Sequence, residues 1–388
     1  LGGMTRVDAV HDARTRIGAL TTGAAALYQS LADADAMATT GYVSGGLEPA
    51  TARARYDDDI QRAGRLLTGA AGLPSPGDPP AEGASTGGRP LPVYTGLVEN
   101  ARALNRLGLP LGQAYLASAS KLMQTTILPA VEQVRTAESA ALAAAYAHGA
   151  GTPFAVLAVG LAVFVALADL ALRERRRTNR VLNLGLTVAG IAVLVSVAWW
   201  AVAAITADVR LGGARAHTEA GAALDEAGIA VLQARSNESL VLVARNSGGG
   251  SSDDAFGAQL DRVVNDFGLL AAAERADPEL TERVTALRGA AMAWGAAHRQ
   301  VRLLDDSGQY PRAVASVVGQ GPNTSGGAFD ALDAALATAI GEERAAFAVD
   351  VDAAERALVA LPWISAALAL VAAGAVIVGI GRRVGEYR

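Results

Sequence analysis

Histidines are the side chains of this sequence best suited to acid–base or metal chemistry, and they are scattered. His11, His148, His217 and His298 fall in separate helical stretches, without a His-Glu-x-x-His spacing and without an acidic cluster beside them. The chain contains no cysteine, which excludes thiolate metal sites and disulfides. We therefore predict no catalytic residue, no metal site and no cofactor, and we interpret His298 as a core or bundle-edge histidine.

Two short motifs give weaker chemical signals. The run Asp57-Asp58-Asp59 suggests a cation site, but three adjacent carboxylates on a helix point in different directions, which favours a solvated face. Gly319-Gln320-Gly321 lacks the strand–turn–helix setting and the lysine of a phosphate-binding loop, so we interpret it as a turn. Neither motif indicates an enzyme.

Arginine clusters beside apolar runs carry a stronger signal. The two clusters are Arg173, Arg175, Arg176, Arg177 and Arg180, and then Arg382, Arg383 and Arg388. Short cytoplasmic loops collect Arg and Lys, so both clusters mark the inner face of a membrane. We predict that Arg173, Arg175, Arg176, Arg177, Arg382 and Arg383 form a cytoplasmic output surface. The alternative is that they only fix the topology and bind anionic membrane lipids.

Three apolar runs next to these clusters are each long enough to cross a bilayer, which takes roughly 20 residues. The predicted order is an outer segment 1–153, a span 154–172, a cytoplasmic loop 173–180, a span 181–205, an outer segment 206–360, a span 361–381 and a cytoplasmic tail 382–388. This order places a multi-pass protein in the plasma membrane, with most of its mass outside the cell. We expect a fourth, N-terminal span that precedes the given sequence; the alternative is an N-terminus left outside by signal-peptide cleavage.

The two outer segments resemble two copies of one unit. Each begins with Leu-Gly-Gly next to a membrane position, and Tyr56 and Phe256 each lead a helical stretch that ends in Leu-Leu. Gly112-Gln113 and Gly308-Gln309 are each followed by a tyrosine. The Pro/Gly-rich stretch 73–92 is interpreted as an insert that the second copy lacks. The shared order of these matches favours an internal duplication.

Apolar periodicity predicts that both outer segments are helical. In the second segment, steps of four and three residues join Leu280, Val284, Leu287, Ala291, Trp294, His298 and Val301. In the first segment, a seven-residue repeat joins Val10, Ile17, Ala24 and Leu31, with Leu20 and Leu27 beside it. Gly/Ser breaks at 41–46 and 247–252 end the first helix of each segment. The predicted fold is an all-α membrane protein with two tandem extracytoplasmic antiparallel four-helix bundles and transmembrane helices.

The net charge and the predicted turns limit which partners the protein can bind. The formal net charge is −5, and the second outer segment holds the excess of acids, which argues against nucleic acid. The turns farthest from the membrane are predicted to receive an outer protein, with Tyr42, Tyr115 and Tyr310 as binding residues. The alternative is that these tyrosines only close the ends of the bundles. The duplication predicts a monomer that acts as an internal pseudo-dimer, with a homodimer as the alternative.

A span, a helical bundle and a second span resemble the sensor half of bacterial chemoreceptors and sensor kinases. The duplicated form, with an Arg-rich inner loop and a tail ending Gly385-Glu386-Tyr387-Arg388, resembles the GlnX-type membrane proteins of actinobacteria. That resemblance implies coupling of an extracytoplasmic amino-acid-binding lipoprotein (GlnH-like) to a cytosolic Ser/Thr protein kinase (PknG-like). A sensor half with a trimmed output domain, or a membrane scaffold, remains an open alternative.

Overall fold

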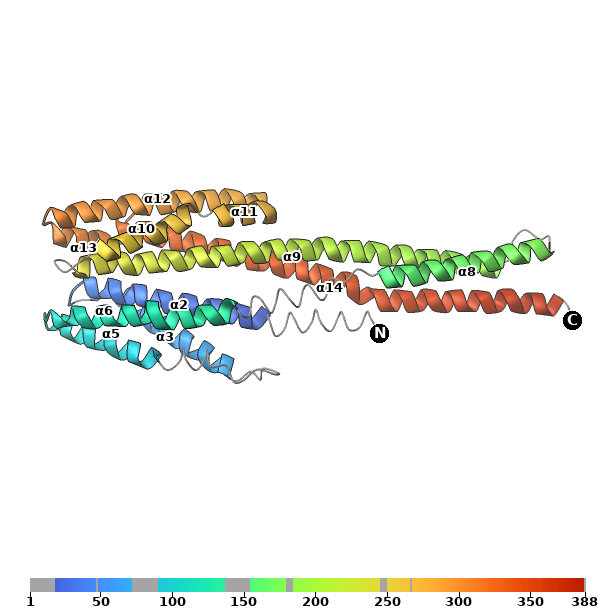
Figure 1. Cartoon of the computed structure of the whole chain (residues 1–388), viewed down its shortest axis with the longest axis horizontal. Coiled ribbons are helices and arrows are strands. Elements are labelled where there is room, and N and C mark those ends of the chain that lie inside the picture. The colour runs from blue at the N-terminus through green and yellow to red at the C-terminus, as the bar shows by residue number, and fades with distance from the viewer. Residues whose placement is uncertain are drawn as a thin grey trace. The chain divides into compact units, whose positions relative to one another are not determined.

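The computed structural model describes residues 18–46, 48–71, 90–136, 154–178, 184–244, 250–265 and 267–386. Every element in these ranges is a helix (Figure 1). They are α2 (Gly18–Val43), α3 (Ala50–Ala71), α5 (Leu91–Arg106), α6 (Leu111–Leu122), the π-helical turn η2 (Met123–Ile127), α8 (Phe154–Thr178), α9 (Leu184–Ala244), α10 (Gly250–Val264), α11 (Phe267–Ala276), α12 (Pro278–Asp306), α13 (Tyr310–Val318) and α14 (Ser325–Glu386). The all-α prediction is confirmed for this part of the chain.

Packing divides the chain into two compact units. The large unit comprises Arg14–Ala143 and Ala216–Ala345, which we call its first half and its second half. The small unit comprises Leu1–Ala13, Ala144–Arg215 and Ala346–Arg388. Both predicted outer segments therefore contribute most of their residues to the same compact unit.

The first half has a core rich in alanine and leucine, in which α2 packs against α3 and α5 packs against α6. Ala24, Leu27 and Leu31 of the predicted repeat are buried in α2, which confirms the repeat at these positions. The other repeat positions lie outside the described side chains: Val10, Ile17 and Leu20. The predicted break also holds, because α2 ends at Val43 and Gly45 follows at φ 84°.

The second half is built around α12, and every predicted position of its heptad seam is buried. Trp294 is fully buried and meets the ring of Phe256 edge-on, with the ring centroids 5.1 Å apart. Asp277 caps the start of α12 by accepting a hydrogen bond of 3.0 Å from the backbone N–H of Glu279. A Ser/Asp-type cap followed by proline is a strong helix-start signal. At the predicted 247–252 break, α9 ends at Ala244 and α10 already begins at Gly250.

Side chains of α2 and α9 join the two halves of the large unit. The hydroxyls of Thr40 and Ser239 lie 3.1 Å apart, and Ser236 donates to the carboxylate of Asp35 over 2.8 Å. In both contacts the partners are about 200 positions apart in sequence and advance in the same direction along the two helices. This in-register contact is the geometry that two parallel copies of one helix adopt in a dimer.

Two matching turns support the internal repeat but correct its register. Gly108 and Gly308 both have positive φ, 69° and 76°. The backbone N–H of Leu109 donates to the Leu104 carbonyl over 2.9 Å, and that of Gln309 donates to the Leu304 carbonyl over 2.8 Å. These turns lie 200 positions apart, so the sequence-based match of Gly112 with Gly308 was wrong.

Gly112 instead lies inside α6, where a Cβ would come within 2.9 Å of both the Ala101 carbonyl and the Tyr42 hydroxyl. With Gly108 matched to Gly308, equivalent positions in the two halves lie 200 residues apart, as Thr40 and Ser239 or Asp35 and Ser236 nearly do. Stretch 73–92 is therefore not extra length, because the second half has α11 and the start of α12 at the corresponding positions.

The small unit contains apolar helix. Among the described residues, one helix is long and apolar enough to cross a membrane, within Thr187–Ala244, while Ala158–Leu170 and Trp363–Val378 are shorter apolar stretches. Here Trp200 donates its indole N–H to the Ser365 hydroxyl over 2.8 Å. α14 continues as one helix from Ser325 to Glu386, through Pro362.

Candidate functional site

The three tyrosines predicted to bind a partner meet in one apolar cluster. Tyr42, Tyr115 and Tyr310 are each half-buried and pack against it. Its buried members are Val43, Ala101, Leu116, Leu242, Val243, Val301, Ala313 and Val317. The cluster draws on both halves of the large unit, and the α5–α6 and α12–α13 turns lie at the same end of that unit (Figure 1). We call this end the tip.

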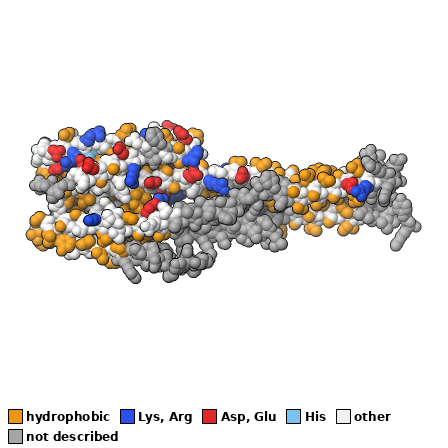
Figure 2. Space-filling view, viewed as in Figure 1, with side chains coloured by type: hydrophobic (Ala, Val, Ile, Leu, Met, Phe, Trp, Pro, Cys, Tyr) orange, Lys and Arg blue, Asp and Glu red, His pale blue; other side chains and the backbone are white. Residues whose placement is uncertain are grey.

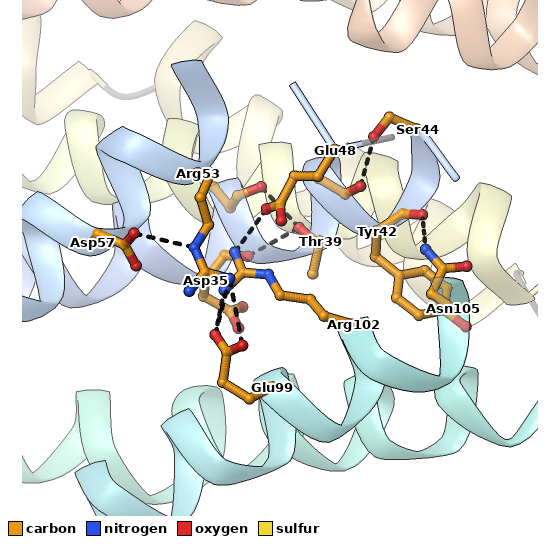
Figure 3. Close-up of polar contacts among 12 residues, drawn as sticks. Asp35, Thr39, Tyr42, Ser44, Glu48, Arg53, Asp57, Glu99, Arg102 and Asn105 are labelled. Atoms are coloured by element: carbon orange, nitrogen blue, oxygen red, sulfur yellow. Dashed lines mark hydrogen bonds and ion pairs between the residues drawn. The ribbon is translucent and has the colours of Figure 1, made fainter. Parts of the chain in front are cut away.

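Tyr42 is held in place at the tip from two sides. Its backbone carbonyl accepts a hydrogen bond of 2.8 Å from the side-chain amide of Asn105 (Figure 3). Burial, and then the neighbouring Tyr310, raise the pKa of Tyr42. These contacts show packing of Tyr42 at the end of the unit, as the alternative interpretation expects, and its role in partner binding stays a prediction.

Arg102 fixes the turn between α2 and α3, a role that the sequence did not reveal. Its guanidinium is almost fully buried and donates to Glu48 over 2.7 Å and to Glu99 over 2.8 Å (Figure 3). It also lies 4.1 Å from the centroid of the Tyr56 ring, a cation–π contact. Gly41 allows this arrangement, because a Cβ at that position would meet the Glu48 carboxylate at 2.4 Å. The sequence hint was the Glu99–Arg102 spacing on one helical face.

Asp35 is a buried carboxyl that is surrounded by hydroxyls. Its Oδ2 accepts from Ser120 and Ser236, each over 2.8 Å, and its Oδ1 accepts from Tyr94 over 3.3 Å. Burial raises the pKa of Asp35, while these neutral donors oppose the shift. The site ties together α2, α5, α6 and α9 without an ion pair to Asp35 among the described contacts.

The run Asp57-Asp58-Asp59 does not form a uniform solvated face, so that expectation was wrong for its last member. Asp57 is half-buried and Asp58 is exposed, and they pair with Arg53 and Arg62. Asp59 is buried, because this position of α3 faces α2. Sequence could not reveal which of three adjacent positions faces the neighbouring helix.

Asp59 forms a buried acid pair with Asp33. Burial and then the neighbouring Asp33 raise the pKa of Asp59 to about 9. Asp33 Oδ1 and Asp59 Oδ2 are buried without a hydrogen-bond partner among the described groups, and a proton retained by Asp59 would supply a donor to this pair. Asp33 also accepts from Arg55 over 2.6 Å, and Arg55 reaches Asp333 of the second half over 2.7 Å.

His298 is buried as predicted, but the statement that no acids lie beside the histidines was wrong. Its Nδ1 lies 3.2 Å from Glu238 and its Nε2 lies 2.8 Å from Asp253. The two acids come from α9 and α10, 60 and 45 positions away, which local spacing does not reveal. Phe256 stacks on the imidazole, with the ring centroids 3.8 Å apart.

The same network holds Glu238 in its charged form. Arg235 donates to Glu238 over 2.6 Å and to the Val317 carbonyl over 2.7 Å, and Ser325 makes a short hydrogen bond to Glu238. The His298 hydrogen bond and the Arg235 charge lower the pKa of Glu238 against the cost of burial. The two carboxylates raise the pKa of His298, again against burial. We call these residues the Glu238 network.

The buried polar groups of the large unit contact one another and join several helices. No group of three or more His, Asp or Glu side chains in the described part of the chain is arranged to hold a metal ion. Hydrogen bonds and ion pairs occupy Asp35, Glu238 and His298 from several helices at once. Such networks fix the relative register of the helices that contribute to them.

The arginines of the predicted inner face are only partly described. Arg173 pairs with Asp169 over 2.7 Å, one helical turn apart in α8. Arg175, Arg176 and Arg177 belong to α8 and Arg382 and Arg383 to α14, but their side chains lie outside the described part.

Comparison with known proteins gives one match. Residues 9–147 match the family model of the actinobacterial sensor domain. This match supports an actinobacterial sensor protein. The sensor-domain segment contains α2 through η2, including Tyr42, Tyr115 and the Arg102 contacts, and the family points to a role in sensing and signal transduction. No curated protein and no solved structure matches the chain.

Proposed function

We propose that this protein is a non-enzymatic transmembrane signal transducer. It would couple an extracytoplasmic amino-acid-binding lipoprotein to a cytosolic Ser/Thr protein kinase, with the tip as the outer docking site. The sensor-domain match over residues 9–147 is the observation that carries the proposal. The partners come from the resemblance to GlnX-type proteins.

Two helices are suited to carry the signal. α9 has 61 residues and includes both the apolar stretch and the side chains that contact α2. α14 has 62 residues and includes both Asp333, which pairs with Arg55, and the apolar stretch Trp363–Val378. Helix shifts of roughly 1–2 Å are typical of such transitions. A shift of this size would change the spacing of Arg175–Arg177 against Arg382 and Arg383, where the kinase is proposed to dock.

The proposed topology can be tested directly, because the chain has no cysteine. Single variants Ser307→Cys and Thr178→Cys place one thiol in the proposed outer part and one in the proposed inner loop. We expect a membrane-impermeant maleimide to label position 307 in intact cells, and position 178 only after permeabilisation. Labelling of position 178 in intact cells would contradict the topology.

The coupling is tested with the full chain in lipid nanodiscs. We expect it to bind the purified lipoprotein, and we expect deletion of the chain from the host to abolish amino-acid-dependent phosphorylation of the kinase's substrates. Replacing Arg382 and Arg383 with Gln, with insertion confirmed by the maleimide assay, should weaken that phosphorylation. Intact kinase signalling in the deletion strain would refute the coupling and favour the sensor half of a chemoreceptor or sensor kinase.

A further inference from the structure

Three leucines stand exposed on the α5–α6 turn. Leu107, Leu109 and Leu111 are 71%, 46% and 58% exposed. Figure 2 shows hydrophobic side chains gathered at this end of the large unit. Exposed apolar side chains that cluster on one feature are typical of interaction sites, whereas isolated ones are ordinary. We call residues 107–111 the leucine turn.

Hydrogen bonds hold the leucine turn in one conformation. The N–H groups of Leu107 and Leu109 both donate to the Leu104 carbonyl, over 3.2 and 2.9 Å. Gly108 supplies the positive φ that the turn requires, and the Gly112 N–H donates to the Leu109 carbonyl over 3.2 Å. A partner would therefore meet leucines that are already ordered, which lowers the entropic cost of binding.

The matching turn of the second half shows that the fold does not need Leu107 and Leu109. Ser307 and Gln309 occupy the positions of Leu107 and Leu109, with the same positive-φ glycine between them and the same hydrogen bond back to the preceding helix. Both polar residues are exposed. The two turns therefore share a backbone and differ in surface chemistry.

Charge restricts what can cover the leucine turn. From Leu104 to Ser120 the chain carries Arg106 and no acidic residue, and the Arg106 side chain is exposed. A second copy of this chain would bring its own Arg106 against the same charge, which opposes self-association through this turn. A partner surface with carboxylates around an apolar pocket would complement both the leucines and Arg106.

The neighbouring turn argues against a lipid surface. Asp305 and Asp306 lie at the end of α12, at the same tip, where both pair with Arg302, and Asp306 is 66% exposed. A flat anionic bilayer that met Arg106 would also press on this ion-pair network, which offers little net attraction and would have to be desolvated. A protein pocket can enclose the leucine turn and leave the charged turn in solvent.

We propose that the leucine turn docks into an apolar pocket with an acidic rim on the outer partner protein. The inference rests on the proposed function for the kind of partner, and it deepens that function by assigning the contact to one turn of the first half. Leu107 and Leu109 act as anchors, and Arg106 reaches the rim. The matching turn of the second half contributes little to the affinity for this partner.

The second half supplies the test variant. Leu107→Ser with Leu109→Gln gives the leucine turn the residues that the matching turn already tolerates, so the fold should survive. Ser307→Ala with Gln309→Ala is the matched control. Each full chain in nanodiscs is titrated with the purified amino-acid-binding lipoprotein, freed of its lipid anchor, and its melting temperature is recorded. We expect affinity to fall about tenfold or more for the leucine variant, and to stay within about twofold for the control.

Equal binding by the leucine variant and the natural chain would overturn the inference and leave the proposed function intact. If the natural chain itself fails to bind the lipoprotein, the proposed partner is wrong, and a photo-crosslinking residue at position 109 or 309 in living cells decides the inference. A crosslink at 109 alone, to a protein whose purified form binds the leucine variant at least tenfold more weakly, supports it. Crosslinks to lipid, to a second copy or to nothing overturn it.

Discussion

Glu238 in the second half of the large unit and the acids Asp35 and Asp59 in the first half are buried in opposite ways. In the second half, Glu238 is surrounded by Arg235 and His298, and its pKa is lowered although it is fully buried. In the first half, Asp35 receives hydrogen bonds from neutral donors and Asp59 faces another acid, and burial raises the pKa of both. Related helices can therefore stabilise a buried acid by pairing its charge or by keeping its proton. Asp35 and Asp59 should therefore favour the folded state at acidic pH, whereas the contribution of Glu238 should be lost as pH falls.

Measurements that separate the halves need a local probe. The chain has four tryptophans, and Trp294 is fully buried in the second half. A background with Trp199, Trp200 and Trp363 replaced by Phe leaves Trp294 as the reporter of the large unit. Urea unfolding followed by its fluorescence gives the free energy of unfolding used below.

The largest expected effect comes from removing the charge at the centre of the Glu238 network. Glu238→Ala leaves Arg235 and His298 buried without their shared partner. We expect a loss of about 3–5 kcal/mol in the free energy of unfolding, because an uncompensated buried charge is costly. The exposed Glu226→Ala is the control and should change it by less than about 0.5 kcal/mol. Similar losses for both variants would contradict the pairing.

His298→Asn tests the pH dependence of the second half. Because the folded pKa of His298 is raised, its stabilisation is fully present below its ordinary pKa of 6.5 and is lost as pH rises through the raised value. Glu238, with a lowered pKa, contributes above its ordinary 4.5 and loses this contribution as pH falls. The variant should therefore lose about 2–3 kcal/mol near pH 5.5, and less at pH 9. A pH-independent difference would show that His298 acts only by packing.

Asp59→Asn should raise the free energy of unfolding, whereas His298→Asn should lower it. The folded pKa of about 9 means that, as pH rises from 3.8 towards 9, the folded chain retains a proton that the unfolded chain has released. Stability therefore falls over that window, and Asn, which cannot ionise, removes the fall. We expect the variant to be about 1–2 kcal/mol more stable than the natural chain at pH 8 and equal to it near pH 4. Exposed Asp58→Asn serves as the control.

The smallest effect tests what the halves share. Gly108→Ala and Gly308→Ala each force a side chain into a positive-φ turn, and neither Cβ would meet another atom. We expect both variants to lose about 1 kcal/mol, since only the backbone conformation is penalised. Costs that differ by more than about 1 kcal/mol would show that the two turns are not equivalent.

The amino-acid sequence by itself determined the helical character of the chain and the faces that its helices bury. The seam of α12 was read from steps of four and three residues, because an α-helix returns to the same face at that interval. The end of α2 was predicted from the Gly/Ser break at 41–46, and α13 ends at Val318, just before the predicted turn at Gly319–Gly321. These features are local, so a short window of sequence contains their physical cause.

Only the tertiary structure decided which polar groups meet. Asp35 bonds to Ser236, 201 positions away, and His298 to Glu238, 60 positions away. Whether a carboxyl at such a position is charged depends on the donors that other helices bring, and no local period encodes them. The same limit explains why Asp59 was expected in solvent and why Gly112 was matched to Gly308 in place of Gly108. Helical periodicity identifies the buried face, but the partner across that face is chosen by packing the whole chain at once.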